Sequence, residues 1–314
     1  MKILFAAPER AWGGLLAGLR EDNPHYDFIA SGDFKINSLE GVDVLIPTMT
    51  QVTAADLKGS PQLKLIQQVG VGLEGVDLAT AAELDIQVAN VPSEVSGNAD
   101  SVAEMGIYLM IGLGRNVRGM AESFSQRRIG NPMGQALKGK TVGLVGLGGI
   151  GKALAARLQP FGVRLIGIKQ HNPQSICGEF GLDWAGTLVD LPRLLGESDY
   201  VVLAIPDTHE THCLMGEIAF TQMKPGACLI NLGRGGLIER DALEKALVEE
   251  RIAGAGLDVF WEEPVNPEDP IFRQNILPTP HIAGATDIAK EGIQAAVSEN
   301  LRRLERGEEL LYCR

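Results

Sequence analysis

The chain has 314 residues, a net charge of −12 and a hydrophobic content of 45%. This length suits two domains or one large domain, and the apolar content is sufficient for well-filled cores. The acidic balance, with a pI near 5.0, argues against nucleic acid or an anionic membrane as a partner, but leaves room for a small anionic substrate held by a local arginine.

Strand-like and helix-like segments alternate along the first third of the chain. Short apolar, β-branched runs predict strands, and Ala- and Leu-rich runs predict helices. The predicted strands lie at 2–6, 28–30, 42–47, 65–69 and 86–89, and the predicted helices lie at 12–20, from Thr53, and at 78–84. This alternation is typical of βαβ units, which form a parallel sheet with helices on both faces.

The alternation of predicted strands and helices continues after a connecting region. A helix is predicted over 100–113, and the polar segment 115–139 is predicted to be an arm or connector. Further strands are predicted at 141–145, 163–168, 200–205, 227–231 and 252–259, and further helices at 150–159, 191–195, 239–250 and 287–306. The Pro-rich segment 264–280 is predicted to be a loop. The sequence therefore predicts an α/β fold.

Cysteine usage and the start of the chain indicate a reducing compartment. The four cysteines form no C-x-x-C pair and no cluster with metal-ligand spacing, so we expect no metal site and no disulfide framework. They are Cys177, Cys213, Cys228 and Cys313. The start has only five apolar residues in a row before Pro8, too few for a signal peptide, and no apolar run approaches the roughly 20 residues of a membrane span. We expect a cytoplasmic protein.

A glycine-rich motif follows the strand predicted at 141–145. Residues 146–151 have the sequence GLGGIG, a G-x-G-x-x-G between a strand and a helix. Gly146 allows a tight turn, Gly148 lets the backbone approach a pyrophosphate, and Gly151 lets helix and strand pack closely. The helix N-terminus adds free N–H groups and the positive end of its dipole. This context predicts dinucleotide binding rather than a merely flexible loop.

The end of the next strand indicates which dinucleotide is bound. A site for NAD usually has Asp or Glu there, to hold the ribose 2′-hydroxyl. This chain has Lys169, Gln170 and His171 instead. A cation can pair with a 2′-phosphate, so NADP is favoured over NAD. The alternative is that Lys169 belongs to a solvated loop and makes no contact with the ribose of the cofactor.

Three polar residues lie near the carboxyl ends of later predicted strands, where doubly wound sheets bind ligands. They are Arg234, Glu263 and His281. Alone, each has an ordinary interpretation, as a surface cation, an exposed acid or a core histidine. Together they suit acid–base chemistry on an anionic substrate, because His exchanges protons near neutrality, a carboxylate orients its ring, and the Arg fork matches a substrate carboxylate.

Six motifs occur in order along nearly the whole chain. They are VGVGLEGVDL (69–78), SVAE (101–104), GLGGIG (146–151), INLGRGG (230–236), DVFWEEP (258–264) and PHIAGAT (280–286). Jointly they resemble the D-isomer-specific 2-hydroxyacid dehydrogenases. The resemblance implies two doubly wound parallel-sheet domains: a flavodoxin-like substrate domain of residues 1–98 plus 287–314, and an inserted Rossmann domain of residues 99–286 that binds NAD(P). It also implies a homodimer, with the helix and arm after residue 99 near the interface.

The resemblance further implies roles for single residues. The implied catalytic residues are Arg234, which binds substrate, His281, the acid/base, and Glu263, its partner. The implied cofactor contacts, with the glycine motif and the strand end included, are Val71, Ser101, Gly146, Gly148, Gly149, Ile150, Gly151, Lys169, Gln170, Ile205, Pro206, Thr211, Leu232, Gly233, Asp258, His281 and Gly284. The implied substrate contacts are Val71, Gly72, Arg234 and His281. Asp258 matches the residue that holds the nicotinamide carboxamide.

Two departures from the family pattern affect the cofactor site. Lys169 stands where an acid is typical, which agrees with the argument for NADP. Gly149 stands where members often carry Arg, so one side-chain contact to phosphate is missing. A third position, Glu263, separates the chain from the formate dehydrogenases of the family, which have Gln there.

The implied activity is hydride transfer between a nicotinamide cofactor and a small 2-oxo or D-2-hydroxy acid. We expect the reductase direction, with a substrate like glyoxylate or hydroxypyruvate. Two alternatives stay open: a phosphite dehydrogenase-like enzyme, and a non-enzymatic NAD(H)-sensing protein like the corepressors of this fold, which can keep the same three residues.

Overall fold

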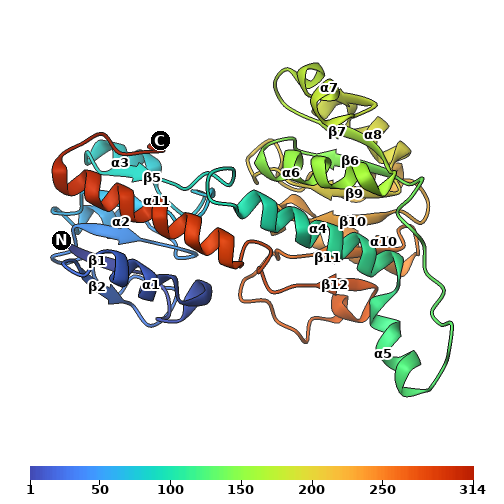
Figure 1. The fold of residues 1–314 in the computed structure, drawn as a ribbon, viewed down its shortest axis with the longest axis horizontal. Coiled ribbons are helices and arrows are strands. Elements are labelled where there is room, and N and C mark those ends of the chain that lie inside the picture. The colour runs from blue at the N-terminus through green and yellow to red at the C-terminus, as the bar shows by residue number, and fades with distance from the viewer. The chain divides into compact units, whose positions relative to one another are not determined.

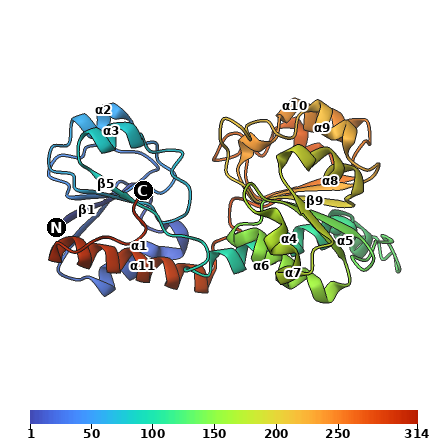
Figure 2. The same ribbon diagram turned by 90° about the horizontal axis from the view of Figure 1, so that it is seen from above.

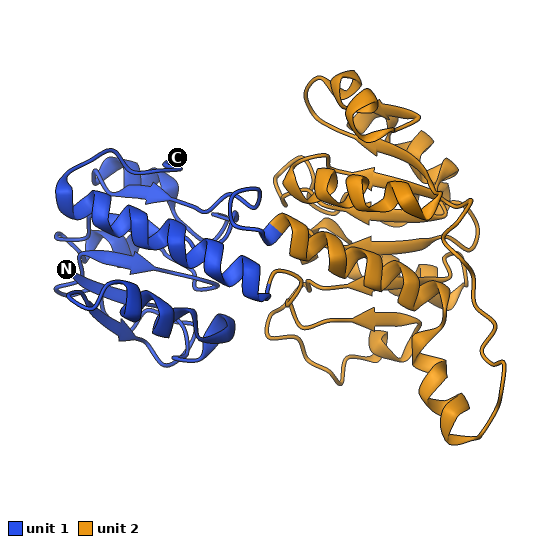
Figure 3. Cartoon of the chain, in the orientation of Figure 1, with its two compact units in different colours: residues 1–98, 285–314 blue, residues 99–284 orange.

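Two compact units make up the chain. The structure, a computed structural model, describes residues 1–314. Met1–Asn98 and Ala285–Arg314 form unit 1, and Ala99–Gly284 form unit 2 (Figure 3). The chain therefore forms most of unit 1, then the whole of unit 2, and returns to unit 1 for its last helix.

Unit 1 is a five-stranded parallel sheet in the order β2-β1-β3-β4-β5 (Figure 1). Its strands are β1 (Lys2–Phe5), β2 (Asp27–Ala30), β3 (Val44–Ile46), β4 (Leu65–Gln67) and β5 (Gln87–Ala89). Its helices are α1 (Ala11–Asp22), α2 (Ala54–Lys58), α3 (Leu78–Glu83) and α11 (Asp287–Arg306). In Figure 2, α2 and α3 cover one face of the sheet, and α1 and α11 cover the other. This is the flavodoxin-like doubly wound order.

Unit 2 is a seven-stranded parallel sheet in the order β12-β11-β10-β9-β6-β7-β8. Its strands are β6 (Thr141–Val145), β7 (Arg164–Ile168), β8 (Trp184–Gly186), β9 (Tyr200–Leu203), β10 (Cys228–Asn231), β11 (Gly254–Leu257) and β12 (Ile276–Pro278). Its helices are α4 (Asn98–Gly114, which begins in unit 1), α5 (Val117–Ser125), α6 (Gly149–Leu158), α7 (Cys177–Phe180), α8 (Leu191–Glu197), α9 (Glu217–Gln222) and α10 (Arg240–Val248). The strand order reverses between β6 and β9, which is the Rossmann arrangement and places a ligand site at that point.

Apolar layers fill both faces of the unit 2 sheet, as a parallel sheet requires. One layer includes Leu194 and Phe220, from α8 and α9. The other includes Leu109 and Leu154, from α4 and α6. β6 lies in the interior of the sheet, between β9 and β7, with all five residues buried, which explains its unbroken apolar run.

Several short helices and strands were not predicted from the sequence. The segment 264–280, predicted to be a loop, contains η5 (Pro270–Arg273) and β12, so that prediction was wrong in part. β12 ends in Pro278 at the sheet edge, where the missing N–H costs no ladder hydrogen bond. α5 lies within the predicted connector, and β8, α7 and α9 have only three to six residues, too few for a periodic signal. None of the helices combines the length and apolar character needed to cross a membrane.

Candidate active site

The glycine turn between β6 and α6 is shaped for close backbone approach. Gly146 has a φ of 106°, and an added Cβ there would overlap the Ala204 carbonyl oxygen. An added Cβ at Gly151 would overlap the Gly146 carbonyl oxygen. Gly148 is the N-cap of α6, and an added Cβ there would meet nothing within 4 Å. A phosphate can therefore approach the first N–H groups of the helix, and the turn fits the pyrophosphate of a dinucleotide.

The residues after β7 lie at the same edge of the sheet as this turn. Ile168 ends β7 and pairs with Val145, the last residue of β6, and Lys169 and Gln170 follow directly. The Lys169 N–H donates to the Gly186 carbonyl oxygen at 2.8 Å, which fixes the backbone where the lysine side chain begins. The four residues between β7 and η2 (Pro173–Ile176) are KQHN, so no acid is available there for a ribose hydroxyl.

The loops after β9 and β10 pack against each other at this edge. Thr211 Oγ1 donates to the Pro206 carbonyl oxygen at 2.7 Å. The Leu232 N–H donates to Leu203 of β9 at 3.0 Å. An added Cβ at Gly233 would lie 2.6 Å from the Ile205 carbonyl oxygen. The structure therefore brings five of the predicted cofactor contacts together: Ile205, Pro206, Thr211, Leu232 and Gly233.

Asn231 shapes the turn that presents Arg234. Asn231 ends β10 and is fully buried. Its side-chain oxygen accepts the Gly233 N–H at 3.0 Å, and its amide donates to the Arg234 carbonyl oxygen at 2.8 Å. An added Cβ at Gly235 would overlap the Phe260 carbonyl group. The turn that carries Arg234 is therefore in direct contact with the loop after β11.

Glu263 and His281 form a hydrogen-bonded pair. His281 Nδ1 lies 2.7 Å from Glu263 Oε2, and Glu263 Oε1 accepts the Phe260 N–H at 2.9 Å. The side chains are only 29% and 20% exposed, respectively. Burial works against ionisation of Glu263, but the hydrogen bond and charge of His281, the Phe260 N–H and the charge of Arg234 together lower the pKa of Glu263. An ionised Glu263 thus holds the imidazole through Nδ1 and sets its orientation.

Asp258 fastens the segment that carries His281. Asp258 is 2% exposed, and its carboxylate accepts Thr279 Oγ1–H at 2.6 Å and the N–H groups of Ile282 and Ala283 at 3.0 Å each. Its carbonyl oxygen accepts the His281 N–H at 2.9 Å. His281 has a φ of 52°, in the left-handed region that residues other than glycine seldom occupy. Asp258 therefore holds this segment in a conformation that the local sequence does not favour.

Comparisons with known proteins identify the family of the chain. Residues 107–283 match the family model for the D-isomer specific 2-hydroxyacid dehydrogenase, NAD binding domain. The glyoxylate reductase of Thermococcus litoralis is 37% identical over 284 residues, which cover 87% of this chain and 83% of that protein. The chain belongs to the D-isomer specific 2-hydroxyacid dehydrogenases.

Solved structures support the same family for this dehydrogenase. An acyclic imino acid reductase in complex with NADPH and D-Arg has a TM-score of 0.85 at 26% identity, with 100% of both chains covered. The apo D-lactate dehydrogenase from Escherichia coli has a TM-score of 0.84 at 28% identity, covering 100% of this chain and 99% of that one. The predictions of the family, of two doubly wound domains and of a nicotinamide-dependent oxidoreductase are confirmed.

Unit 1 of the dehydrogenase holds two of the remaining predicted contacts. Val71 and Gly72 follow β4 at the carboxyl edge of the unit 1 sheet, and the Val71 side chain is exposed. Asn90 Nδ2 donates to the Val71 carbonyl oxygen at 2.8 Å, which ties this loop to the end of β5. In unit 2, Ser101 is buried in α4 and Gly284 is the last residue of the unit.

The groups that hold these side chains in place were not predicted from the sequence. Asn231, Phe260 and Thr279 carry no charge and act through one or two hydrogen bonds each, so nothing in their residue types singled them out. Asp258 was assigned only to the nicotinamide carboxamide, and its anchoring of the His281 segment was missed. What these residues share is a position at or just after the carboxyl end of neighbouring strands. That position can be recognised only once the strand order is known.

Proposed function

We propose that this dehydrogenase reduces small 2-oxo acids, of the glyoxylate or hydroxypyruvate kind, to D-2-hydroxy acids. The observation that carries the proposal is the Glu263–His281 pair, whose loop contacts the turn of Arg234 at the sheet edge that also bears the glycine turn. A proton donor, its ionised partner and a fixed cation are the groups that carbonyl reduction of an anionic acid needs. The name of the relative from Thermococcus litoralis supports the substrate class.

Each side chain has a separate role in the proposed reaction. The guanidinium of Arg234 binds the substrate carboxylate and polarises the neighbouring carbonyl. Val71 and Gly72 are the substrate contacts proposed in unit 1, through their backbone N–H groups. His281 donates a proton to the carbonyl oxygen as it becomes a hydroxyl. Glu263 keeps the imidazole oriented and stabilises its charge. The bound nicotinamide cofactor supplies the hydride to C2.

We propose NADP(H) as the preferred cofactor. Lys169 follows β7 with no acid nearby in the chain, so it offers a cation to a 2′-phosphate. With Gly149 in place of an arginine, the pyrophosphate depends on the N-terminus of α6. The NADPH complex of the similar imino acid reductase supports the assignment. The proposed contacts are those predicted above, namely Val71, Ser101, Gly146, Gly148, Gly149, Ile150, Gly151, Lys169, Gln170, Ile205, Pro206, Thr211, Leu232, Gly233, Asp258, His281 and Gly284.

We assign cofactor binding to unit 2 and substrate binding to unit 1. We also propose a homodimer formed through α4 and the arm that follows it. Large exposed apolar side chains occur along this stretch, among them Tyr108, Phe124 and Ile129. Burial against a second copy would remove them from water. A cytoplasmic location stays a prediction from the sequence.

Initial rates of NADPH and NADH oxidation with glyoxylate, hydroxypyruvate, pyruvate and phenylpyruvate test substrate and cofactor together. We expect NADPH with glyoxylate or hydroxypyruvate to be fastest. Faster rates with NADH would show that Lys169 is only a solvated loop residue. If the cofactor binds but no acid is reduced, the proposed reaction is wrong, and the phosphite dehydrogenase-like and corepressor-like alternatives become the leading ones.

The variant His281→Ala tests the assigned proton donor in the same assay. Loss of a general acid lowers turnover by about 10²- to 10⁴-fold, and we expect a much smaller change in NADPH affinity, measured by fluorescence titration. His25→Ala, at an exposed histidine of unit 1, is the control. Equal losses in turnover and cofactor affinity would contradict the assignment.

A further inference from the structure

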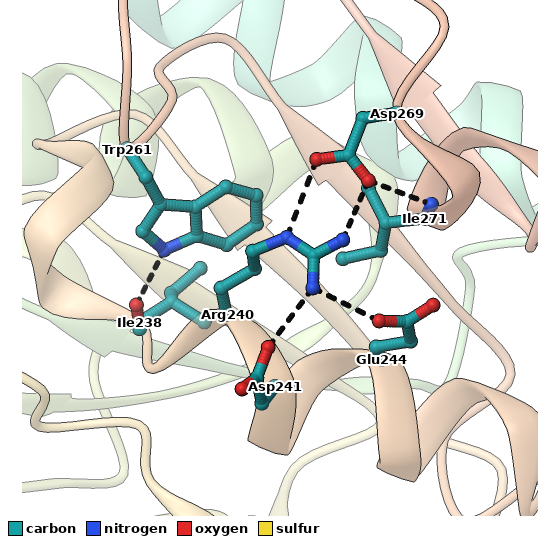
Figure 4. Close-up of polar contacts among 7 residues, drawn as sticks. All are labelled: Ile238, Arg240, Asp241, Glu244, Trp261, Asp269 and Ile271. Atoms are coloured by element: carbon teal, nitrogen blue, oxygen red, sulfur yellow. Dashed lines mark hydrogen bonds and ion pairs between the residues drawn. The ribbon is translucent and has the colours of Figure 1, made fainter.

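Two contacts tie the loop after β11 to the segment that leads into α10 (Figure 4). Trp261 Nε1 donates to the Ile238 carbonyl oxygen at 2.6 Å. The guanidinium of Arg240 binds Asp269 through Nε and Oδ2 at 3.3 Å and through Nη2 and Oδ1 at 2.5 Å. Both contacts lie within unit 2, and both join the same two stretches of chain, 238–240 and 261–269.

The two tied stretches continue into the two loops of the active site. Arg234 is followed by η4 (Gly235–Leu237) and then directly by the first stretch. Glu263 lies inside the second stretch, two residues after Trp261. Both contacts are therefore joined to Glu263 by a short stretch of chain, and Glu263 is joined to His281 by a 2.7 Å hydrogen bond.

Arg240 is the most heavily bonded of these groups. Its Nη1 also donates to Asp241 Oδ1 and to Glu244 Oε2, both at 2.9 Å, so one guanidinium contacts three carboxylates. Its hydrogen bond to Asp269 is the main reason that the pKa of Arg240 is raised and that of Asp269 is lowered. Asp269 in turn caps η5 by accepting the Ile271 N–H at 3.0 Å. The pair therefore stays ionised near neutral pH and fixes where η5 begins.

We propose that Arg240 is a positioning residue for the reaction: through Asp269 it holds the loop after β11 where Glu263 meets His281. This inference rests on the proposed function. Arg240 acts through other residues and does not touch the substrate. A planar fork bound at two points sets both the distance and the orientation of its partner, whereas a lysine in its place would keep the charge without that geometry.

Four variants test this role: Arg240→Gln, Arg240→Lys, Asp269→Asn, and the double variant Arg240→Gln with Asp269→Asn. We expect Arg240→Gln to lower kcat about tenfold or more with NADPH KM within about twofold, because misplaced reacting groups slow the chemical step. Arg240→Lys recovers only part of the loss. The double variant is no worse than the stronger single one, as for two groups that act as a unit. The pH dependence of kcat also changes, because it reports the Glu263–His281 pair.

Arg164→Gln is the matched control. Arg164 is the first residue of β7, so it lies at the amino ends of the strands of the same sheet, away from the candidate active site. It makes comparable ion pairs with Asp183 at 2.6 Å and Glu197 at 2.8 Å. We expect it to lower the melting temperature while leaving kcat and its pH dependence at wild-type values. The positioning role is overturned if Arg240→Gln behaves in the same way.

An NMR titration of the His281 imidazole keeps this test separate from that of the proposed function, because it needs no substrate. If the wild-type protein reduces no 2-oxo acid, the proposed function fails by itself. An Arg240→Gln titration curve that differs from wild type still supports the positioning of the Glu263–His281 pair. Superimposable curves would count against it.

Discussion

Gly235 is the residue at which the two loops of the candidate active site meet. An added Cβ would overlap the Phe260 carbonyl group and lie 2.6 Å from the Trp261 nitrogen. These are backbone atoms, so no rotation of a side chain can relieve the overlap. Either the turn that carries Arg234 or the loop that carries Glu263 has to move instead.

The variant Gly235→Ala is therefore expected to lower kcat by about tenfold or more, with a loss of about 1–3 kcal/mol in the free energy of unfolding from overpacking. Steady-state kinetics and denaturant unfolding measure the two effects. Gly178→Ala in α7 is the control, because an added Cβ there meets nothing within 4 Å. A folded Gly235→Ala protein with wild-type kcat would show that the contact does not position the loop.

Strain at His281 is a second feature of single residues. A left-handed conformation outside glycine costs on the order of 1–3 kcal/mol and persists only where the surroundings enforce it. Here Asp258 supplies that enforcement, through one bond to the His281 N–H and two to the N–H groups that follow. The strained backbone conformation therefore lies at His281, the residue proposed to transfer the proton.

Among the elements, the starts of three central strands are joined through Asp199. Its Oδ2 accepts the Thr141 N–H of β6 at 2.8 Å, its Oδ1 accepts Lys224 Nζ–H at 2.6 Å, and its carbonyl oxygen accepts the Cys228 N–H of β10 at 2.9 Å. Burial works against ionisation, but the hydrogen bonds from Lys224 and the Thr141 N–H to the carboxylate, with the charges of Lys224 and Lys140, lower the pKa of Asp199.

This lowered pKa has a definite consequence for stability. The contribution of Asp199 is fully present above the unfolded-state value of about 3.9 and is lost as the pH falls through the lower folded-state value. We expect Asp199→Asn to reduce the free energy of unfolding by about 1–3 kcal/mol at pH 7, with the difference from wild type narrowing below about pH 4. Urea unfolding from pH 3 to 7 measures it, with Asp27→Asn, at an exposed site of β2, as control. A difference independent of pH would exclude the ionised form as the source.

Elements with strong local patterns were predictable, and short ones were not. β6 and α11 occur with the bounds predicted for them, because an unbroken apolar run and a long amphipathic pattern are properties of neighbouring residues. β8 and β12, with three residues each, are strands only because β7 and β11 lie beside them. Their pairing partners, rather than their own residues, decide their conformation.

For the whole molecule, the exposed apolar stretch of α4, α5 and the arm is the basis of the proposed dimer. A groove there is lined by Ile107, Tyr108, Ile111 and Met120, and Phe124 is among the exposed large apolar residues of α5. Light scattering after gel filtration should give twice the chain mass of 33.6 kDa. Phe124→Glu should shift the protein toward the monomer, because it would place a charge in the apolar interface. Val189→Glu, at another exposed apolar residue, should not. A wild-type protein that elutes with the mass of one chain would refute the dimer.

The sequence by itself determined the α/β class, the glycine turn and the candidate residues, because apolar periodicity and residue chemistry are local properties. Resemblance to a known family added the pairing of Glu263 with His281, which the structure places at 2.7 Å across 18 residues of chain. Only the tertiary structure decided what holds that pair. The bonds of Asn231 depend on the turn after β10, and the bond between Arg240 and Asp269 spans 29 residues. Such contacts exist because parallel strands bring their carboxyl ends to one edge, and no pattern of neighbouring residues encodes which side chains meet there.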